Sequence, residues 1–222
     1  MITVHHLNNS RSQRVLWLLE ELGLPYEIHH YQRDAKTSLA PPELRAVHPL
    51  GKSPVITDGG LTVAESGAIL EYLVDTYGQG RLKPTDPQDL LHYRYYLHFA
   101  EGSAMPPLVM KLVFNKIKRA PMPFFVKPIA KGIADKVLAS FVQPTLDAQL
   151  KFLESELAAR PWFAGAEMTA ADVQMSFPLE AAATRGGAIE SYPKIQAFLK
   201  RIHARPAYQR ALERGGPYEL MS

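Results

Sequence analysis

Two short segments in the first third of the chain hold residue types that could bind a small peptide with charges at its ends. The stretch GKSPVITDGGLTVAESG places Lys52, Ser53 and Pro54 before an apolar run, and Glu65 and Ser66 after it. Ser66 stands where a helix is expected to begin, and the positive end of a helix dipole attracts carboxylates. Lys52 adds a cation and Glu65 adds an anion. We therefore expect a charged, peptide-like ligand to bind between the two segments.

The first 80 residues must position these groups, and they alternate between strand and helix signals. Short β-like runs predict strands at residues 2–5, 26–29, 55–57 and 61–63. Helices are predicted over residues 10–22 and 66–77, and a short one near residue 41, where two prolines suit a first helical turn. Gly-rich residues 58–60 join the last two strands as a hairpin. The order βαβαββα indicates an α/β domain with a mixed sheet over residues 1–80.

The second half of the chain has a different pattern. Breaker residues between 77 and 87 predict a linker, and residues 87–222 are predicted to form an all-helical domain. Helical spacing joins residues 146, 150, 153 and 157, and also residues 195, 198, 199 and 202. Prolines at 106–107, 121, 123, 128 and 144 are expected to divide the region into several helices. Thr169 and Asp172 predict a capping box with a structural role.

The composition excludes several classes of protein. The 222 residues contain no cysteine, which excludes disulfides, a Cys-x-x-Cys redox pair and thiolate metal sites. No apolar run approaches the ~18 residues of a membrane span, and no export signal is visible. We therefore expect a cytoplasmic protein with no membrane partner. The net charge is only +3, and the densest cationic stretch, residues 111–131, lacks zinc-finger spacing and RNA-binding aromatic signatures, so we also expect no nucleic-acid partner.

Two histidine pairs, His5-His6 and His29-His30, are the only local suggestion of a metal site in the sequence. Adjacent side chains in a strand point to opposite faces of the sheet, so neither pair can chelate as a unit. We expect these histidines to be structural and the protein to bind no metal.

Five motifs, in order and at consistent spacing, resemble those of the cytosolic glutathione S-transferases, in particular serine-type members of bacterial or fungal kind. They are Ser10-x-x-x-Arg14-Val15, Leu24-Pro25-Tyr26-Glu27, His48-Pro49-Leu50-Gly51-Lys52-Ser53-Pro54, Ala64-Glu65-Ser66-Gly67-Ala68-Ile69 and Thr169-x-x-Asp172. The resemblance covers nearly the whole chain and fades between residues 90 and 145. It implies a thioredoxin-like N-terminal domain that binds glutathione, a helical domain that shapes the electrophile site, and a homodimer.

The resemblance gives each charged residue a partner on glutathione. Ser66 suits the γ-glutamyl carboxylate, Glu65 the ammonium beside it, and Lys52 the glycine carboxylate at the other end. The bond between Ser53 and Pro54 is implied to be cis, which X-Pro bonds adopt at a cost of only about 0.5–1 kcal/mol. The Ser53 backbone could then pair with the cysteinyl peptide group of the ligand, as in strand addition.

The resemblance also raises the question of which group activates the glutathione sulfur. The family uses a Tyr, Ser or Cys just after the first strand, and this chain has no cysteine and no tyrosine before Tyr26. Ser10 stands four residues before Arg14, where serine-type members carry the catalytic hydroxyl. Ser10 is also a good helix N-cap, so a capping role alone stays open. Asn9 and Ser12 are the alternative donors.

The site for a second substrate is expected in the helical half. Phe99, Met105, Met110 and Phe114 lie in the run that should face the sulfur, and such residues could line an adaptable apolar pocket or simply form core. Glu101 lies in the same run, and the resemblance implies that it could reach the partner subunit's glutathione, as an acidic residue near this position does in some relatives. The leading function is conjugation of glutathione to small hydrophobic electrophiles. The alternatives are glutathione-dependent reduction of peroxides or disulfides, and a glutathione-binding scaffold with little turnover.

Overall fold

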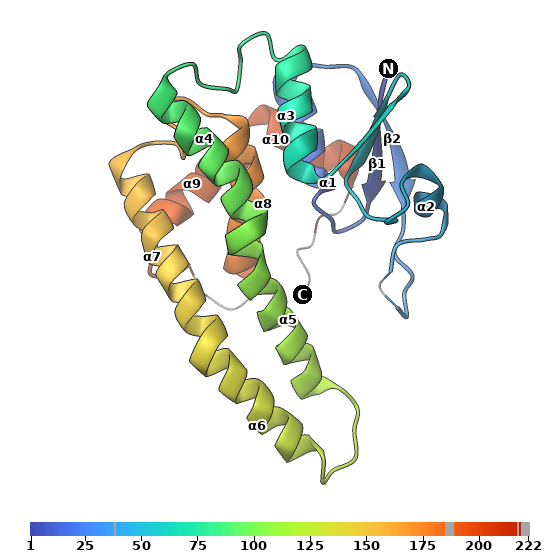
Figure 1. The fold of residues 1–222 in the computed structure, drawn as a ribbon, viewed down its shortest axis with the longest axis vertical. Helices are drawn as coiled ribbons and strands as arrows, with labels where there is room; N and C mark the ends of the chain where they lie inside the picture. Colours follow the sequence, from blue (N-terminus) through green and yellow to red (C-terminus); the bar gives the residue numbers. More distant parts are fainter. Residues whose placement is uncertain (38, 185–188, 217, 219–222) are drawn as a thin grey trace.

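The structure is a computed structural model that describes residues 1–37, 39–184, 189–216 and 218. Its N-terminal part holds a sheet with strand order β2-β1-β3-β4, in which β1 and β2 run parallel and β3 is antiparallel to β1 and β4. The predicted order βαβαββα and the thioredoxin-like mixed sheet are confirmed (Figure 1). The elements are β1 (Ile2–Leu7), α1 (Ser12–Leu22), β2 (Tyr26–Tyr31), α2 (Glu43–Val47), β3 (Val55–Asp58), β4 (Leu61–Ala64) and α3 (Ser66–Tyr77).

The period-two pattern of β1 divides its side chains between two faces of the sheet. Val4 lies opposite Ile56 of β3, and both are fully buried in the main core with α1 and α3. On the alternate face, Leu7 packs with Leu44 of α2 in a smaller cluster. Gly23 ends α1 with φ 67°, a left-handed conformation that glycine adopts without steric cost. The sheet is therefore covered on both sides, and the C-terminal end of β1 leads directly to Ser10.

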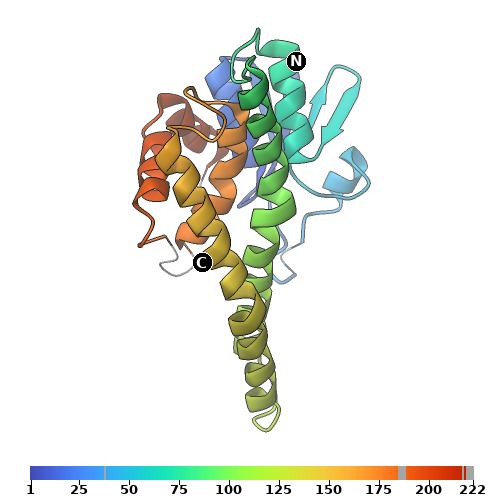
Figure 2. The same cartoon turned by 60° about the vertical axis from the view of Figure 1, so that its left-hand side comes forward.

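An all-helical part follows, and its first helices form two long continuous runs. The runs lie side by side, and their far end, formed by α5 and α6, projects from the body as a hairpin (Figures 1 and 2). The elements are α4 (Pro87–Phe99), the π-helix η1 (Ala100–Ala104), α5 (Met105–Arg119), α6 (Lys127–Val137), the π-helix η2 (Leu138–Val142), α7 (Gln143–Ala159), α8 (Ala170–Thr184), α9 (Pro193–His203) and α10 (Pro206–Gly215).

The second half forms several helices, as expected, but at two places a proline does not end the helical path. Pro106-Pro107 and Pro144 lie in the first turns of α5 and α7, directly after η1 and η2, and the helical path continues through them. A proline within a helix lacks an N–H and clashes with the preceding turn. The π-helical turns directly before these prolines accommodate the missing N–H and the clash, so the helical path is not interrupted. Pro121 and Pro123 do mark a break, because they stand in the turn between α5 and α6.

One hydrophobic core joins the sheet part to the helical part. The centre of this core is α8, which buries nearly all its residues and contacts α1, α3, α4 and α9. The apolar stripes predicted for residues 146–157 and 195–202 are buried in α7 and α9. Residues 78–86 form turns between α3 and α4, and a domain boundary there, with domains at 1–80 and 87–222, stays a prediction.

The start of α8 has a variant of the predicted capping box. The Asp172 carboxylate accepts hydrogen bonds from the Thr169 backbone N–H (2.8 Å), the Thr169 hydroxyl (3.0 Å) and the Phe163 backbone N–H (2.8 Å). Burial raises the pKa of Asp172 to about 6. Its partners are backbone and hydroxyl groups of its own neighbourhood, which fits a structural role. Among the described helices, none combines the length and the apolar character that crossing a membrane requires.

Candidate active site

The sequence-predicted binding residues line one pocket of about 220 Å³ at the edge of the sheet. The loop before β3 forms one wall, and the junction of β4 and α3 forms another. Helix α1 and the π-helix η1 close the pocket from the side of the helical part. The lining residues are Arg11, His48, Leu50, Lys52, Ser53, Pro54, Ala64, Glu65, Ser66 and Glu101.

The Ser53-Pro54 peptide bond is cis, as the resemblance implies. The Ser53 hydroxyl donates to the His5 carbonyl (2.8 Å) and accepts from the Leu7 N–H (3.3 Å). These two bonds tie the bend to β1, so the loop that carries Lys52 is anchored to the sheet.

The junction of β4 and α3 is held in an unusual backbone conformation. Glu65 has φ 71° and ψ 122°, a region that non-glycine residues rarely occupy, and Ser66 begins α3 with 2% of its surface exposed. Backbone outliers of this kind cost about 1–3 kcal/mol and cluster at ligand sites. Glu65 and Ser66, at this junction, both line the pocket.

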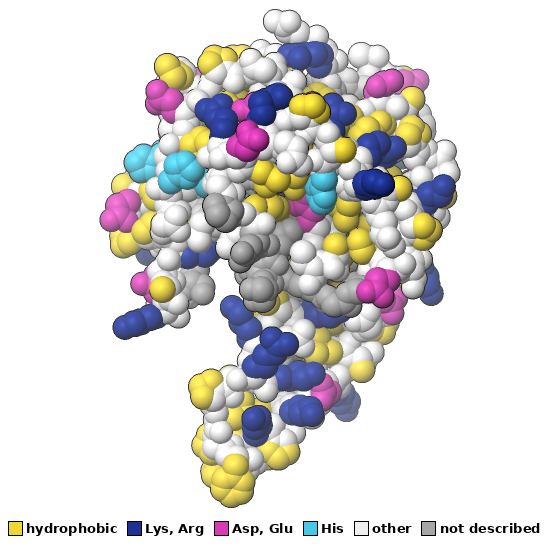
Figure 3. Space-filling model, turned by 180° about the vertical axis from the view of Figure 1, so that it is seen from behind, with side chains coloured by type: hydrophobic (Ala, Val, Ile, Leu, Met, Phe, Trp, Pro, Cys, Tyr) yellow, Lys and Arg dark blue, Asp and Glu magenta, His cyan; other side chains and the backbone are white. Residues whose placement is uncertain are grey.

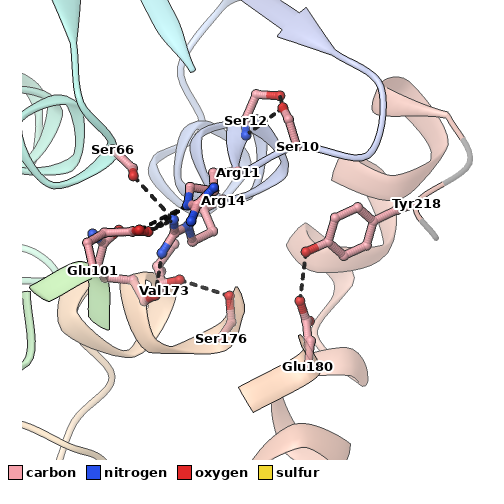
Figure 4. A network of polar contacts seen from close by, with 11 residues as sticks. Ser10, Arg11, Ser12, Arg14, Ser66, Glu101, Val173, Ser176, Glu180 and Tyr218 are labelled. Atoms are coloured by element: carbon pink, nitrogen blue, oxygen red, sulfur yellow. Dashed lines mark hydrogen bonds and ion pairs between the residues drawn. The ribbon is translucent and has the colours of Figure 1, made fainter. Parts of the chain in front are cut away.

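Beneath the pocket, the buried guanidinium of Arg14 joins α1, α3 and α8 (Figure 4). It donates to the Ser66 hydroxyl oxygen (3.2 Å) and to the Gln174 carbonyl (2.6 Å), and it forms an ion pair with Glu101. Since Arg14 is only a donor, Ser66 accepts this bond and keeps its own hydroxyl hydrogen. Ser66 can therefore donate into the pocket.

A proline in α8 provides the carbonyl that Arg14 uses. Pro178 stands inside the helix four residues after Gln174 and has no N–H to bond the Gln174 carbonyl. That carbonyl instead accepts from Arg14. Sequence reasoning missed this link, although the signal was present: a proline within the helix predicted after Thr169 leaves one carbonyl without its helical partner.

Glu101 projects from η1 to the same cluster. It pairs with Arg11 (3.0 Å) as well as Arg14, and about 30% of its side chain remains exposed at the pocket. Burial opposes its ionisation, but the charges of Arg14 and Arg11 outweigh burial, so the pKa of Glu101 is lowered. Glu101 thus compensates a buried cation within its own chain.

Ser10 lies beside the pocket in a chain of hydroxyl groups. Its oxygen is 2.7 Å from the Ser12 hydroxyl oxygen and 3.3 Å from that of Ser53, which lines the pocket. Ser12 is fully buried and lies 2.9 Å from Nδ1 of His6. Ser10 is 4% exposed and also accepts from the backbone N–H of Ser12 (3.2 Å), the first residue of α1.

The state of His6 sets the direction of this chain. Burial lowers the pKa of His6 to about 4, so the ring is neutral near pH 7, and it also hydrogen bonds to the backbone of Gly215. A neutral imidazole has one donor and one acceptor nitrogen, and in the tautomer with its hydrogen on Nε2, Nδ1 accepts from Ser12. Ser12 then accepts from Ser10. In this state the Ser10 hydrogen points toward Ser12, and it must rotate to reach a group in the pocket.

The other candidate residues are not among those that line the pocket. Asn9 adopts a left-handed conformation, with φ 50°, in the turn between β1 and α1. Phe99 and Met110 pack against the core, Met105 is 3% exposed within it, and Phe114 is half-buried on α5. The structure does not bring these four apolar side chains to the pocket, and their contact with an electrophile stays a prediction.

The histidine pairs behave as strand neighbours. His5 faces His29 and His6 faces His30 across the β1–β2 ladder, with ring centroids 6.0 and 5.5 Å apart. Within the described residues, no three His, Asp or Glu side chains gather as a metal site would require.

Known families and proteins match the chain over most of its length. The family described as "Glutathione S-transferase, N-terminal domain" matches residues 1–75, and "Glutathione S-transferase, C-terminal domain" matches residues 113–206. Glutathione S-transferase 1 of Saccharomyces cerevisiae is 36% identical over 223 aligned residues, which cover 96% of this chain and 95% of the yeast protein.

Solved structures agree with these matches. A glutathione S-transferase from Actinobacillus pleuropneumoniae is 33% identical with a TM-score of 0.77, and the match covers 100% of this chain and 95% of that one. A glutathione transferase family member from Pseudomonas fluorescens, solved with two glutathione bound, is 29% identical with a TM-score of 0.72 over 96% and 92% of the two chains.

The fold and the pocket define a two-part protein in which a thioredoxin-like sheet and a helical half meet at a polar site. With the matches above, the chain belongs to the glutathione S-transferase family. It is an enzyme of that family, since a named glutathione S-transferase is similar to it along nearly the whole length of both chains.

Proposed function

We propose that the enzyme conjugates glutathione to small hydrophobic electrophiles through a stabilised glutathione thiolate. The observation that carries the proposal is the pocket itself, where Lys52, Glu65 and Ser66 place a cation, an anion and a helix start around one cavity. Glutathione carries a carboxylate at one end and an ammonium and carboxylate at the other. The cavity therefore offers a complementary group for each charge.

Each end of glutathione has a distinct set of partners in this proposal. The Ser66 hydroxyl, with its oxygen already bonded to Arg14, donates to the γ-glutamyl carboxylate at the start of α3. Glu65 pairs with the ammonium group, and Lys52 with the glycine carboxylate. The backbone of Ser53 pairs with the cysteinyl peptide group, which orients the sulfur toward Ser10.

Ser10 is the proposed donor to the sulfur. A free thiol with a pKa of ~8.5 is only about 3% thiolate at pH 7, and lowering the pKa by two units raises that fraction ~25-fold. Because nucleophilicity falls with pKa, with a slope of roughly 0.4–0.5, nearly tenfold of this gain is lost. Most of the rate must then come from holding sulfur and electrophile together in a pocket with little water.

One observation favours a second candidate function, glutathione-dependent reduction of disulfides or peroxides. The similar protein from Pseudomonas fluorescens was solved with two glutathione bound. Two glutathiones in one site could reduce a disulfide or hydroperoxide without a protein cysteine, and this chain has none. A scaffold with little turnover is the third reading. A cytoplasmic homodimer that acts in detoxification is part of the leading proposal.

A panel assay separates these functions. The purified protein is given glutathione with an aromatic halide, an organic hydroperoxide or a mixed disulfide of glutathione. We expect turnover of the halide, and a Lys52→Ala variant should raise the KM for glutathione because the glycine carboxylate loses its cation. Turnover of the mixed disulfide alone would support the reductase instead, and glutathione binding without turnover of any substrate would support the scaffold.

A further inference from the structure

The tip of the α5–α6 hairpin is an exposed turn without polar side chains. Residues 120–126, Ala-Pro-Met-Pro-Phe-Phe-Val, carry no charge and no side-chain hydrogen-bonding group. Phe124 is 87% exposed and Phe125 is 65% exposed. Figure 3 shows the hydrophobic side chains gathered at the end of the projection. Turns at a protein surface are usually polar, so this composition needs a specific explanation.

The apolar surface continues from the tip along both helices. Val113 and Ile117, one helical turn apart on α5, are 46% and 37% exposed. On α6, Ile129 and Ile133 are 65% and 59% exposed at the same spacing. Single exposed apolar residues are ordinary, but a contiguous exposed apolar patch marks an interaction site.

The same hairpin carries a larger net positive charge than the whole chain. Residues 105–142 contain seven lysine and arginine residues and one acidic residue, Asp135, which gives a net charge of +6. The whole chain carries +3, so the remaining residues together carry −3. Lys118 pairs with Asp135 (2.6 Å). Within the described part of the chain, Lys116, Lys127 and Lys131 are exposed and have no ion pair.

We propose that this hairpin docks the enzyme on the surface of a bilayer that contains anionic phospholipid. Phe124 and Phe125 enter the boundary between headgroups and acyl chains, and the lysines behind them contact the lipid phosphates. Segments that lie in this boundary combine an apolar side with lysines that reach the headgroups. Each lysine or arginine near an anionic surface strengthens such binding about fivefold. The expectation of no membrane partner was based on the lack of a spanning segment, which docking does not require.

The charge distribution favours an anionic bilayer over two other occupants. A second copy of the chain seated tip to tip would bring two +6 surfaces together, and like charges oppose that contact. A nucleic acid would match the charge, but the side chains that extend the patch are Val113, Ile117, Ile129 and Ile133, which cannot stack on bases as aromatic residues do. Moving aliphatic side chains from water into the hydrocarbon of a bilayer is favourable in free energy, which suits these residues to a membrane surface.

Vesicle co-sedimentation of the full chain tests the proposal. We expect binding to vesicles of phosphatidylcholine mixed with phosphatidylglycerol, and little binding to phosphatidylcholine alone. Phe124→Ser/Phe125→Ser should weaken binding about tenfold, since two apolar groups no longer enter the bilayer. Lys116→Gln/Lys127→Gln/Lys131→Gln should weaken it roughly 100-fold at low salt.

Matched controls lie on the body of the protein. Leu39→Ser/Leu61→Ser removes two exposed leucines, and Lys151→Gln/Lys194→Gln/Lys200→Gln removes three exposed lysines; both should bind as the wild type does. A Phe124→Trp variant reports insertion directly, because its fluorescence should shift to shorter wavelength with anionic vesicles only. Circular dichroism checks that each variant is folded.

Three results would overturn the proposal. Equal binding of anionic vesicles by the tip variants and the wild type would remove the hairpin from the contact. Binding of an oligonucleotide with no binding of vesicles would identify a nucleic-acid surface instead. Conversion of a dimer to a monomer by Phe124→Ser/Phe125→Ser, seen by light scattering, would assign the tip to a second copy of the chain.

Discussion

At the scale of single residues, the direction of hydrogen bonds through Ser10, Ser12 and His6 decides what Ser10 can do. In the neutral tautomer with its hydrogen on Nε2, His6 accepts from Ser12, and Ser12 then accepts from Ser10. A thiolate in the pocket would be a stronger acceptor than a neutral hydroxyl, since hydrogen bonds to ionised groups are roughly twice as strong. We therefore expect the Ser10 hydrogen to turn toward sulfur when glutathione binds.

Ser10→Ala should leave the affinity for glutathione nearly intact, because the anchoring groups are elsewhere. It should raise the pKa of the bound thiol by about one to two units, or roughly 1.4–2.7 kcal/mol of lost thiolate stabilisation. The rate loss should be largest near neutral pH and shrink at higher pH, where the thiolate forms unaided. Thiolate absorbance of the glutathione complex against pH measures the shift.

Ser12→Ala is the control for this prediction. It removes the competing acceptor while Ser10 keeps its hydroxyl, so the pKa of the bound thiol should not rise. Identical titration curves for Ser10→Ala and the wild type would exclude Ser10 and direct attention to Asn9.

Glu101 supports the site by compensating Arg14, whose side chain is 1% exposed. Glu101→Gln should lower the free energy of unfolding by about 2 kcal/mol near pH 7, below the 3–5 kcal/mol of a fully buried pair because Glu101 is partly exposed. Its pKa is lowered in the folded state, so this stabilisation is present above the unfolded pKa and is lost as pH falls through the lower folded pKa. Urea unfolding at neutral and acidic pH should show the difference between variant and wild type shrinking in acid. A difference that stays constant with pH would contradict the assignment.

At the scale of elements, the strained backbone of Glu65 between β4 and α3 lowers stability, while its side chain lines the proposed glutathione pocket. Glu65→Gly should raise the free energy of unfolding by about 1 kcal/mol, since glycine tolerates φ 71° but loses more chain entropy on folding. It should also weaken glutathione binding, because the ammonium loses its carboxylate. Thermal unfolding and calorimetry on the same preparation measure both effects.

The matched variant Glu65→Gln separates the two effects. It keeps the side-chain shape and the backbone strain, so it should weaken binding without raising stability. If Glu65→Gly lowered the free energy of unfolding, the side chain of Glu65 would stabilise this junction by more than its backbone strain costs, which would contradict the prediction.

The elements that could be predicted from the sequence are those with local signals. Period-two runs, the helix end at residue 22 and the helix start at Ser66 all depend on nearby residues, and each lies where it was expected. The π-helices η1 and η2 have no comparable local signal. Pro178 signals that the Gln174 carbonyl lacks its helical partner, but no local signal identifies Arg14, 160 residues away, as the donor.

In the candidate site too, the parts encoded by local motifs could be predicted and the contacts between distant segments could not. Lys52 to Pro54 and Glu65 to Ser66 are short motifs, and they do meet at one pocket. The ion pairs of Glu101 with Arg11 and Arg14 were not predicted, and contact of Glu101 with a partner subunit's glutathione stays a prediction. Such ion pairs depend on the packing of distant helices, which no single segment encodes.

At the scale of the whole molecule, we predict a homodimer, as the family resemblance implies. Leu91 and Tyr95 of α4 are 60% and 45% exposed on the body, apart from the hairpin tip, and offer an apolar contact surface. Light scattering at low micromolar concentration should give about twice the monomer mass of 24.8 kDa. A mass near that of the monomer would contradict this prediction.

The central claim is that the pocket between the Ser53-Pro54 bend and the start of α3 binds glutathione. Calorimetric titration of glutathione into the wild type and Ser66→Ala tests it most directly, with Ser155→Ala on the exposed side of α7 as the control. We predict that Ser66→Ala weakens binding by about 1–3 kcal/mol, because a charged acceptor loses its donor, and that Ser155→Ala binds as the wild type does. Unchanged affinity in Ser66→Ala would contradict the claim.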